Sequence, residues 1–225
     1  MKVLFFCCVH IALFGLYSES NQDTYVFENF FKDKQSPGVF VDVGSHDGIS
    51  CSNSYFFEKH LNWNGLCIEP NPDLFRQLRE HRSCFCSNVA CSDRAGDQLF
   101  VLHPCSFVSG LSEFLSEEHK RGFGTRELLA SGAAKEVFVP CESLNNLLDR
   151  YHLTQIDFLT IDTEGADFSI LTSIDFDRFD IKVIAIEGFP SEFQDFMEGK
   201  QYVSFGRIGN DAIFVKNDFL IHKDL

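Results

Sequence analysis

The segment most informative about the architecture is Val39-Phe40-Val41-Asp42-Val43-Gly44-Ser45-His46-Asp47-Gly48. Only Asp42 is polar among its first five residues, a composition typical of a parallel strand buried on both faces. The chain then turns through Gly44 and reaches Gly48 before a helical pattern begins. Open α/β sheets bind ligands beyond the carboxyl ends of their strands, so this segment indicates a ligand site as well as a fold class. A tight strand-to-helix turn without a ligand is the simpler alternative.

Outward from this segment, short apolar strands alternate with helical patterns, and from Asn21 onward there is no linker, repeat or low-complexity tract. Strands are expected at residues 39–43, 65–68, 85–90, 99–102, 137–139, 156–161 and 183–186. This alternation predicts a doubly wound α/β sheet. Two further apolar segments, 202–207 and 212–215, flank Gly209-Asn210 and predict a closing β-hairpin. Residues 109–132 are polar and are expected to form an excursion or lid between strands.

Composition excludes several classes of protein. The chain has 225 residues, a length typical of one domain, and 44% of them are hydrophobic, which excludes an intrinsically disordered protein. It carries 33 acidic against 19 basic residues, a net charge of −14. A surface this acidic repels phosphate backbones and anionic lipid, so we expect no binding to nucleic acid or to an anionic membrane.

Residues 1–20 carry the features of a signal peptide. Lys2 precedes an apolar stretch over residues 3–17, and the small residues Ser18 and Ser20 precede Asn21. We expect cleavage before Asn21, and hence a protein of the secretory pathway or a secreted protein. The stretch is shorter than the roughly 20 residues that a membrane-spanning helix needs, so no stable membrane anchor is expected. The alternative is a buried first element of a cytoplasmic protein.

The cysteines do not indicate a metal site. Nine cysteines fall to seven if Cys7 and Cys8 leave with the signal peptide, and no CxxC motif occurs. Buried thiols, with one or two disulfides at most, are the simpler interpretation. The chain also has no cluster of Asp and His with metal-ligand spacing, so we expect no required metal.

The loop after Asp42 differs from the dinucleotide-binding fingerprint GxGxxG, because His46 stands where the middle glycine would be. Without that glycine a pyrophosphate cannot easily approach the helix N-terminus. A nicotinamide-dependent oxidoreductase is therefore disfavoured. An acid at the end of the strand would instead suit the ammonium group of a ligand.

A second acid, Glu69, ends the next strand, 27 positions after Asp42. A carboxylate in this place can accept hydrogen bonds from both hydroxyls of a ribose. A carboxylate that caps the following helix is the structural alternative. Together the two acids indicate an adenosine ligand without a bound pyrophosphate, and S-adenosylmethionine (SAM) fits this description.

With these features, the sequence resembles the FkbM family of SAM-dependent methyltransferases. The segments that carry the resemblance are Gln22-Asp23 with Phe30-Phe31, residues 39–48, Ser52-Asn53-Ser54, residues 63–72 and residues 156–167. The resemblance as a whole runs from about residue 22 to about residue 216, so it implies one methyltransferase domain over residues 21–225. It also implies a Rossmann-like, mostly parallel seven-stranded sheet with an antiparallel last strand. The implied activity is O-methylation of a hydroxyl on a sugar or small metabolite.

The resemblance also implies the cofactor-binding residues. They are Asp42, Gly44, Ser45 and Gly48 around the methionine part, Glu69 on the ribose, and Ala90 and Cys91, at the end of the third strand, near the adenine.

Asp162 and Glu164, at the end of the strand over 156–161, are expected beside the transferred methyl group and the acceptor. Asp162 is the first candidate for a general base that takes the acceptor's proton, and Glu164 is the second. His46 is a further candidate, and Glu187 is expected to line the acceptor pocket. The structural alternative for the two acids is that they orient a loop or cap the following helix.

The expected partner is therefore a small-molecule or glycan acceptor. The alternative function is that of a catalytically silent member of the same fold, acting as a trafficking or binding protein in the secretory pathway. The intact residues Asp42, Gly44 and Glu69 favour the enzyme.

Overall fold

The computed structural model describes residues 17–188 and 190–221. Its main sheet has seven strands in the order β10-β11-β9-β8-β1-β2-β3. These are β1 (Val39–Val43), β2 (Asn64–Ile68), β3 (Phe85–Ser87), β8 (Gln155–Ile161), β9 (Asp180–Glu187), β10 (Tyr202–Ile208) and β11 (Asp211–Lys216). Strands β3, β2, β1, β8 and β9 are parallel, and β11, the last strand, is antiparallel to both of its neighbours. The predicted doubly wound sheet with its closing hairpin is confirmed.

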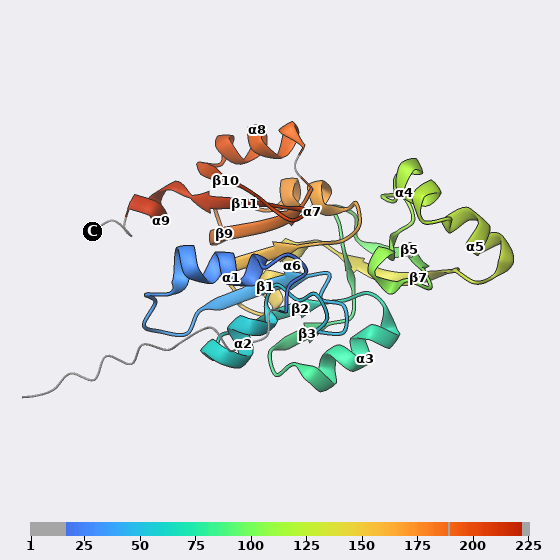
Figure 1. The fold of residues 1–225 in the computed structure, drawn as a ribbon, viewed down its shortest axis with the longest axis horizontal. Helices are drawn as coiled ribbons and strands as arrows, with labels where there is room; N and C mark the ends of the chain where they lie inside the picture. Colours follow the sequence, from blue (N-terminus) through green and yellow to red (C-terminus); the bar gives the residue numbers. More distant parts are fainter. Residues whose placement is uncertain (1–16, 189, 222–225) are drawn as a thin grey trace, which may run out of the picture.

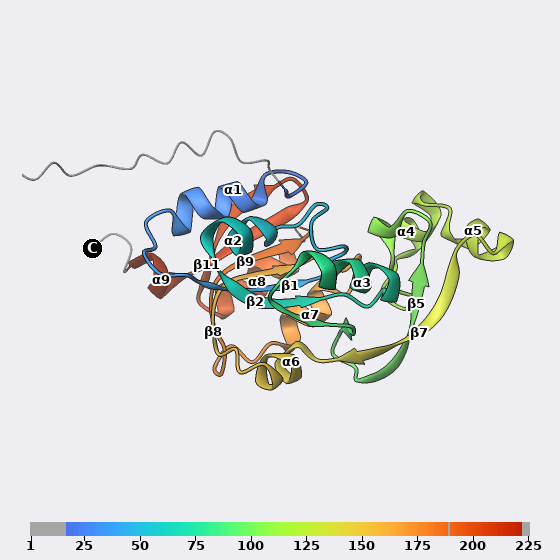
Figure 2. The ribbon, with the colours of Figure 1, turned by 90° about the horizontal axis from the view of Figure 1, so that it is seen from below.

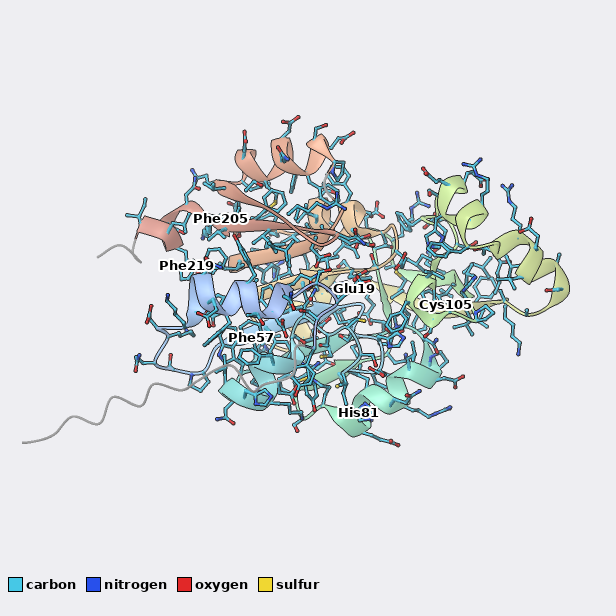
Figure 3. All side chains as sticks on the ribbon, viewed as in Figure 1. Glu19, Phe57, His81, Cys105, Phe205 and Phe219 are labelled. Carbon is cyan, nitrogen blue, oxygen red and sulfur yellow. The ribbon has the colours of Figure 1, made fainter. Side chains whose placement is uncertain are left out.

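Helices cover both faces of this sheet, because its central strands are apolar on both sides (Figure 1). One face carries α1 (Gln22–Val26), which continues as the π-helical η1 (Phe27–Phe31), with α2 (Tyr55–Leu61), α3 (Pro72–His81) and the short α9 (Asn217–Ile221). The other face carries α6 (Leu144–Arg150), α7 (Asp167–Ser173) and α8 (Ser191–Gly199). Many of the phenylalanines lie in these two cores, where Phe57 of α2, for example, packs against Phe31 of η1 (Figure 3).

A second, four-stranded sheet lies beside the first, in the order β4-β7-β5-β6. It consists of β4 (Ala90–Cys91), β5 (Gly96–Leu102), β6 (Gly110–Leu111) and β7 (Lys135–Glu142). Strands β5 and β7 extend away from the main sheet and carry α4 (Glu117–Gly122) and α5 (Thr125–Ser131) (Figures 1 and 2). The polar segment expected to be an excursion over residues 109–132 therefore contains β6 and two short helices.

The third strand is shorter than predicted. It ends at Ser87, whereas Ala90 and Cys91 form β4, which pairs with β7 in the second sheet. The predicted strand over residues 85–90 merged two strands that are separated by residues 88–89. Ala90 and Cys91 are therefore placed by the second sheet.

Residues 1–16 of the predicted signal peptide lie outside the described residues. The predicted peptide ends at Ser20, and the described residues just before that point contact the domain. The Ser18 hydroxyl donates to Asp23 at 2.7 Å, and the Tyr17 ring lies 4.6 Å from that of Tyr55. Among the described residues, no helix combines the length and the apolar character needed to cross a membrane. Cleavage before Asn21 stays a prediction.

Candidate active site

A pocket lies at the carboxyl ends of β1, β2 and β8, where the fold class places ligands. The second sheet closes its other side, through Phe100, Leu111 and the 3-10 turn η2 (Ser106–Val108). The sequence-predicted residues that line the pocket are Asp42, Gly44, Ser45, His46, Glu69, Ala90, Cys91, Asp162 and Glu164. The structure thus brings together residues that are up to 122 positions apart in the chain.

Asp42, at the end of β1, is almost completely buried, with 4% of its surface exposed. The hydroxyl of Ser54 donates a short hydrogen bond to its Oδ2, and Ser52 Oγ donates to the same oxygen at 3.5 Å. Burial raises the pKa of Asp42 above its ordinary value, and the positive charge of Arg82 opposes this rise. Asp42 is therefore held in one orientation at the floor of the pocket.

Arg82 supports the floor of the pocket through hydrogen bonds, although sequence reasoning did not identify it. Its side chain is fully buried beside the Phe40 ring, and its Nε donates to Glu58 Oε2 at 2.5 Å. Its Nη1 donates to the Gly48 carbonyl at 3.1 Å, and its Nη2 donates to Ser54 Oγ at 2.9 Å. Arg82 thus ties the loop after β1 to the serine that holds Asp42. Because Arg82 follows the polar end of α3, the local sequence carries no signal of its burial.

Glu69, at the end of β2, presents a carboxyl group to the opposite side of the pocket. Its Oε2 accepts the His46 backbone N–H at 2.9 Å, and its Oε1 accepts that of Asn71 at 2.7 Å. Each oxygen keeps a free lone pair. Burial raises the pKa of Glu69 to about 8, against the effect of these two hydrogen bonds. Asn71 itself caps α3 with its side chain, so the helix cap does not need the Glu69 carboxylate.

Gly48 is the exception among the predicted cofactor residues, because it is not among the residues that line the pocket. Its φ of +86° makes the turn, and a Cβ atom there would press on Leu78 and Arg82. Ser45 lines the pocket, and its hydroxyl donates to the Asp42 carbonyl at 2.8 Å and accepts from the Ile68 N–H at 3.1 Å. Both residues shape the loop after β1.

His46 connects this loop to the second sheet. Its Nε2 lies 2.8 Å from Ser106 Oγ, and its ring stacks on Phe107 with centroids 4.2 Å apart. Burial lowers the pKa of His46, so the ring is neutral at pH 7. These contacts close the pocket on one side. They engage Nε2 of the ring, whereas Nδ1 lies 3.7 Å from Asp47 Oδ1, and a role of His46 as a general base stays a prediction.

Three carboxylates meet on the β8 and β9 side of the pocket. Asp162, Glu164 and Glu187 each place an oxygen within 4.8 Å of the others. Enclosure by protein and the charges of Glu187 and Asp167 raise the pKa of Asp162 well above its ordinary value, although the side chain keeps solvent access. Burial and neighbouring acids also raise the pKa values of Glu164 and Glu187 to about 8.

This group of three acids could hold a metal ion, since carboxylate oxygens are the ligands that hard divalent cations take. It contains no histidine, and the expectation that no metal is required stays a prediction. Sequence spacing missed the group because β8 and β9 each contribute a strand end, and only their parallel pairing brings those ends together.

His119 of α4 is a further residue that sequence reasoning missed. Its Nε2 lies 3.2 Å from Glu164 Oε2, and its ring packs against Phe123. The sequence predicts only an excursion for the polar segment that contains His119. Glu164, which His119 contacts at the end of β8, lies 45 positions further along the chain. Helix α4, in the excursion between β6 and β7, therefore supplies a side chain to the acidic group.

A shallow groove opens next to these acids. It is lined by Glu118, Gly165, Asp167, Phe168, Glu187, Gly188, Pro190, Phe193, Arg207 and Asn210. The rings of Phe168 and Phe193 stack with centroids 5.2 Å apart, and Phe168 is 38% exposed. Glu187 borders the groove, and its place in an acceptor pocket stays a prediction.

A family model described as the methyltransferase FkbM domain matches residues 42–210. The chain belongs to the FkbM methyltransferase family. The matched residues include the ends of β1, β2, β8 and β9 that surround the pocket. The search of curated proteins gives no sequence match.

The chain is similar in structure to several methyltransferases at low sequence identity. The FkbM methyltransferase from Methylobacillus flagellatus KT is 11% identical with a TM-score of 0.48, over 85% of this chain and 47% of that one. Precorrin-6y C5,15-methyltransferase from Geobacter metallireducens GS-15 is 13% identical with a TM-score of 0.42, over 86% and 88%. The N-terminal domain of human METTL16 in complex with SAH is 12% identical with a TM-score of 0.43, over 88% and 69%. This chain spans 66% of another METTL16 methyltransferase-domain structure and about half of the M. flagellatus protein.

Proposed function

We propose that this chain is a SAM-dependent O-methyltransferase that acts on a hydroxyl of a sugar or small metabolite. The observation that carries the proposal is a single pocket with Glu69 at one side and Asp162 and Glu164 at the other. An adenosine-binding acid and candidate proton acceptors thus share one cavity, as methyl transfer from an adenosyl sulfonium requires.

The residues present fit SAM. The two free lone pairs of Glu69 can accept both ribose hydroxyls, and Ala90 and Cys91 offer an apolar wall for the adenine. Asp42, Gly44 and Ser45 line the part of the pocket next to β8, where the methionine part would lie. The METTL16 domain solved with SAH, the demethylated product, is a structural neighbour consistent with this choice.

When bound, SAM supplies an electrophilic methyl group on a sulfonium. The chain must then hold the acceptor oxygen in line with that group, and alignment of this kind lowers the barrier without covalent help. Asp162 or Glu164, when ionised, can take the hydroxyl proton as the new O–C bond forms. Their closeness means that either acid can replace the other.

The groove beside the acids supports a sugar-like acceptor. The stacked Phe168 and Phe193 rings offer an apolar face, and Glu187 and Arg207 offer hydrogen-bond partners for hydroxyls. A protein without activity that only binds ligands in the secretory pathway would share the cofactor pocket, but it would not need three carboxylates facing the acceptor side.

The test is transfer of a labelled methyl group from SAM to a panel of free sugars, glycosides and small hydroxylated metabolites. We expect label in at least one acceptor, with turnover lowered ~10²–10⁴-fold in Asp162→Asn or in the double variant with Glu164→Gln. Full activity in both single variants and the double variant would remove the acids from catalysis. Binding of SAM without transfer to any acceptor would favour the silent protein.

A further inference from the structure

Ser52-Asn53-Ser54, between the loop after β1 and helix α2, lines the pocket through Ser52 and Asn53. The two serines have structural roles. Ser54 Oγ and Ser52 Oγ donate to Asp42, and Ser52 Oγ also accepts the Tyr55 N–H at 3.1 Å. The proposed function leaves Asn53 without a role, although it lies between these serines.

The amide of Asn53 is held in a defined orientation. Its Nδ2 donates to Thr160 Oγ1 at 3.0 Å and to Asp211 Oδ2 at 3.2 Å. A second amide, from Gln22, donates to the same Asp211 oxygen at 3.1 Å. A carboxylate offers only acceptors, so the nitrogen of Asn53 must face Asp211 and its oxygen must face away.

That oxygen, Asn53 Oδ1, has no hydrogen-bond partner among the described residues, although it is buried and the residue is only 6% exposed. An unpaired buried acceptor is costly, and buried polar atoms in proteins almost always have a partner. Because Asn53 lines the pocket, a ligand in that pocket can supply the missing donor.

The position of Asn53 along the pocket indicates which part of the ligand supplies the missing hydrogen-bond donor. Strand β1 lies between β2, which ends at Glu69, and β8, whose Thr160 contacts Asn53. Adjacent strands are about 4.8 Å apart. Glu69 and Asn53 are therefore on opposite sides of β1, about two strand spacings from each other. A ligand whose ribose contacts Glu69 therefore extends its other end toward Asn53. In SAM, the donor at that end is the ammonium of the methionine part.

We propose that Asn53 Oδ1 accepts a hydrogen bond from the ammonium group of the cofactor, and that Asn53 thereby selects ligands with an amino acid end. This inference rests on the proposed SAM site. It adds to that site a residue that the FkbM match does not assign. Asp211 and Thr160 act through Asn53 by keeping its amide turned toward the pocket.

The test is isothermal titration of SAH, deaminated SAH and decarboxylated SAH into the wild type and into Asn53→Ala. We expect Asn53→Ala to bind SAH and its decarboxylated analogue about 10- to 100-fold more weakly, since a hydrogen bond to a charged group is lost. Deaminated SAH should bind the wild type and the variant equally. The control variant is Asn145→Ala, whose amide also bonds on both sides, to Ser173 and Asp175, outside the pocket. If Asn53→Ala does not fold, Asn53→Ser gives the same comparison.

Each other outcome overturns the inference. Equal weakening for SAH and deaminated SAH would mean that Asn53 acts on another part of the ligand or only on the fold. Weakening that disappears with decarboxylated SAH would mean that the amide faces the carboxylate. Unchanged SAH affinity in the variant would remove Asn53 while leaving the cofactor site intact. No SAH binding by the folded wild type would instead overturn the proposed function, and the inference with it.

Discussion

Gly44 and Asp162 are in such close contact that a Cβ atom on Gly44 would overlap the Asp162 carbonyl oxygen. Gly44 follows β1 and Asp162 follows β8, and the Asp162 N–H donates to the Val43 carbonyl at 2.9 Å. The two neighbouring strand ends thus meet without a side chain between them. This contact places the candidate base next to the loop that forms the floor of the cofactor pocket.

Gly44→Ala should therefore destabilise the protein. The φ of +93° disfavours a side chain, and the carbonyl of Asp162 leaves no room for one. Strain and overpacking together predict a loss of about 2–5 kcal/mol in the free energy of unfolding, measured by urea denaturation. Gly96→Ala is the matched control, because φ there is +105° but nothing lies within 4 Å. Equal losses in the two variants would show that the contact with Asp162 is unimportant.

Binding of SAH should release a proton from Glu69. Its pKa of about 8 leaves the carboxyl group mostly protonated at pH 7, whereas two ribose hydroxyls would stabilise the ionised form. Ionisation that is linked to binding means that affinity rises as the pH rises from 6 to 8 and levels off above 8. Titrations at pH 7 in buffers of different ionisation enthalpy measure the proton directly. Glu69→Gln should show neither effect, and a wild type without proton release would argue against ribose at Glu69.

The main sheet could be predicted from the sequence because its parallel strands are largely apolar, as in the run from Val183 to Ile186. The second sheet could not, since β5 and β7 pair antiparallel across an excursion and expose residues such as Phe138, which is 74% exposed. The sequence predicts the strands at residues 99–102 and 137–139 individually, but it does not predict that they pair with each other.

The pocket acids were predictable for a similar reason, because strand ends converge in any doubly wound sheet. Arg82 and His119 were not, because each reaches the site through a side chain from a polar segment. Their burial depends on contacts that are distant in the sequence, and no local pattern reports such contacts. Gly48 was assigned to the cofactor from its motif, whereas its conformation serves the turn.

His119 should act as a positioning residue for Glu164. The His119→Ala variant lacks the contact with Glu164, so the Glu164 carboxylate is no longer held in place. Because a misplaced reacting group slows the reaction, we expect kcat to fall ~10- to 100-fold. The KM for SAM should change little, because His119 does not line the cofactor pocket. His119→Gln, which can still hydrogen-bond to Glu164, should recover most of the activity. His103→Ala serves as the control, because His103 also contacts Phe123 of the excursion, and an equal loss of kcat there would indicate a general effect of the excursion.

Residues 17–20 should stabilise the domain. A protein that begins at Asn21 lacks the hydrogen bond from Ser18 to Asp23 and the packing of Tyr17 on Tyr55. We expect it to be about 1–2 kcal/mol less stable than one that begins at Tyr17, measured by thermal unfolding. Sequencing of the N-terminus of protein secreted by cells shows where cleavage occurs. Equal stability of the two forms would mean that these contacts contribute nothing.

The central claim is that the pocket between Glu69 and Asp162 binds an adenosyl cofactor. Its most direct test is an isothermal titration of SAH into the purified wild type, with NAD and with the Glu69→Ala variant as comparisons. The account predicts one SAH per chain, at least tenfold weaker binding in the variant through loss of charge-assisted hydrogen bonds, and no heat with NAD. A folded wild type that binds no SAH, or a Glu69→Ala variant that binds it as tightly as the wild type, would contradict the account.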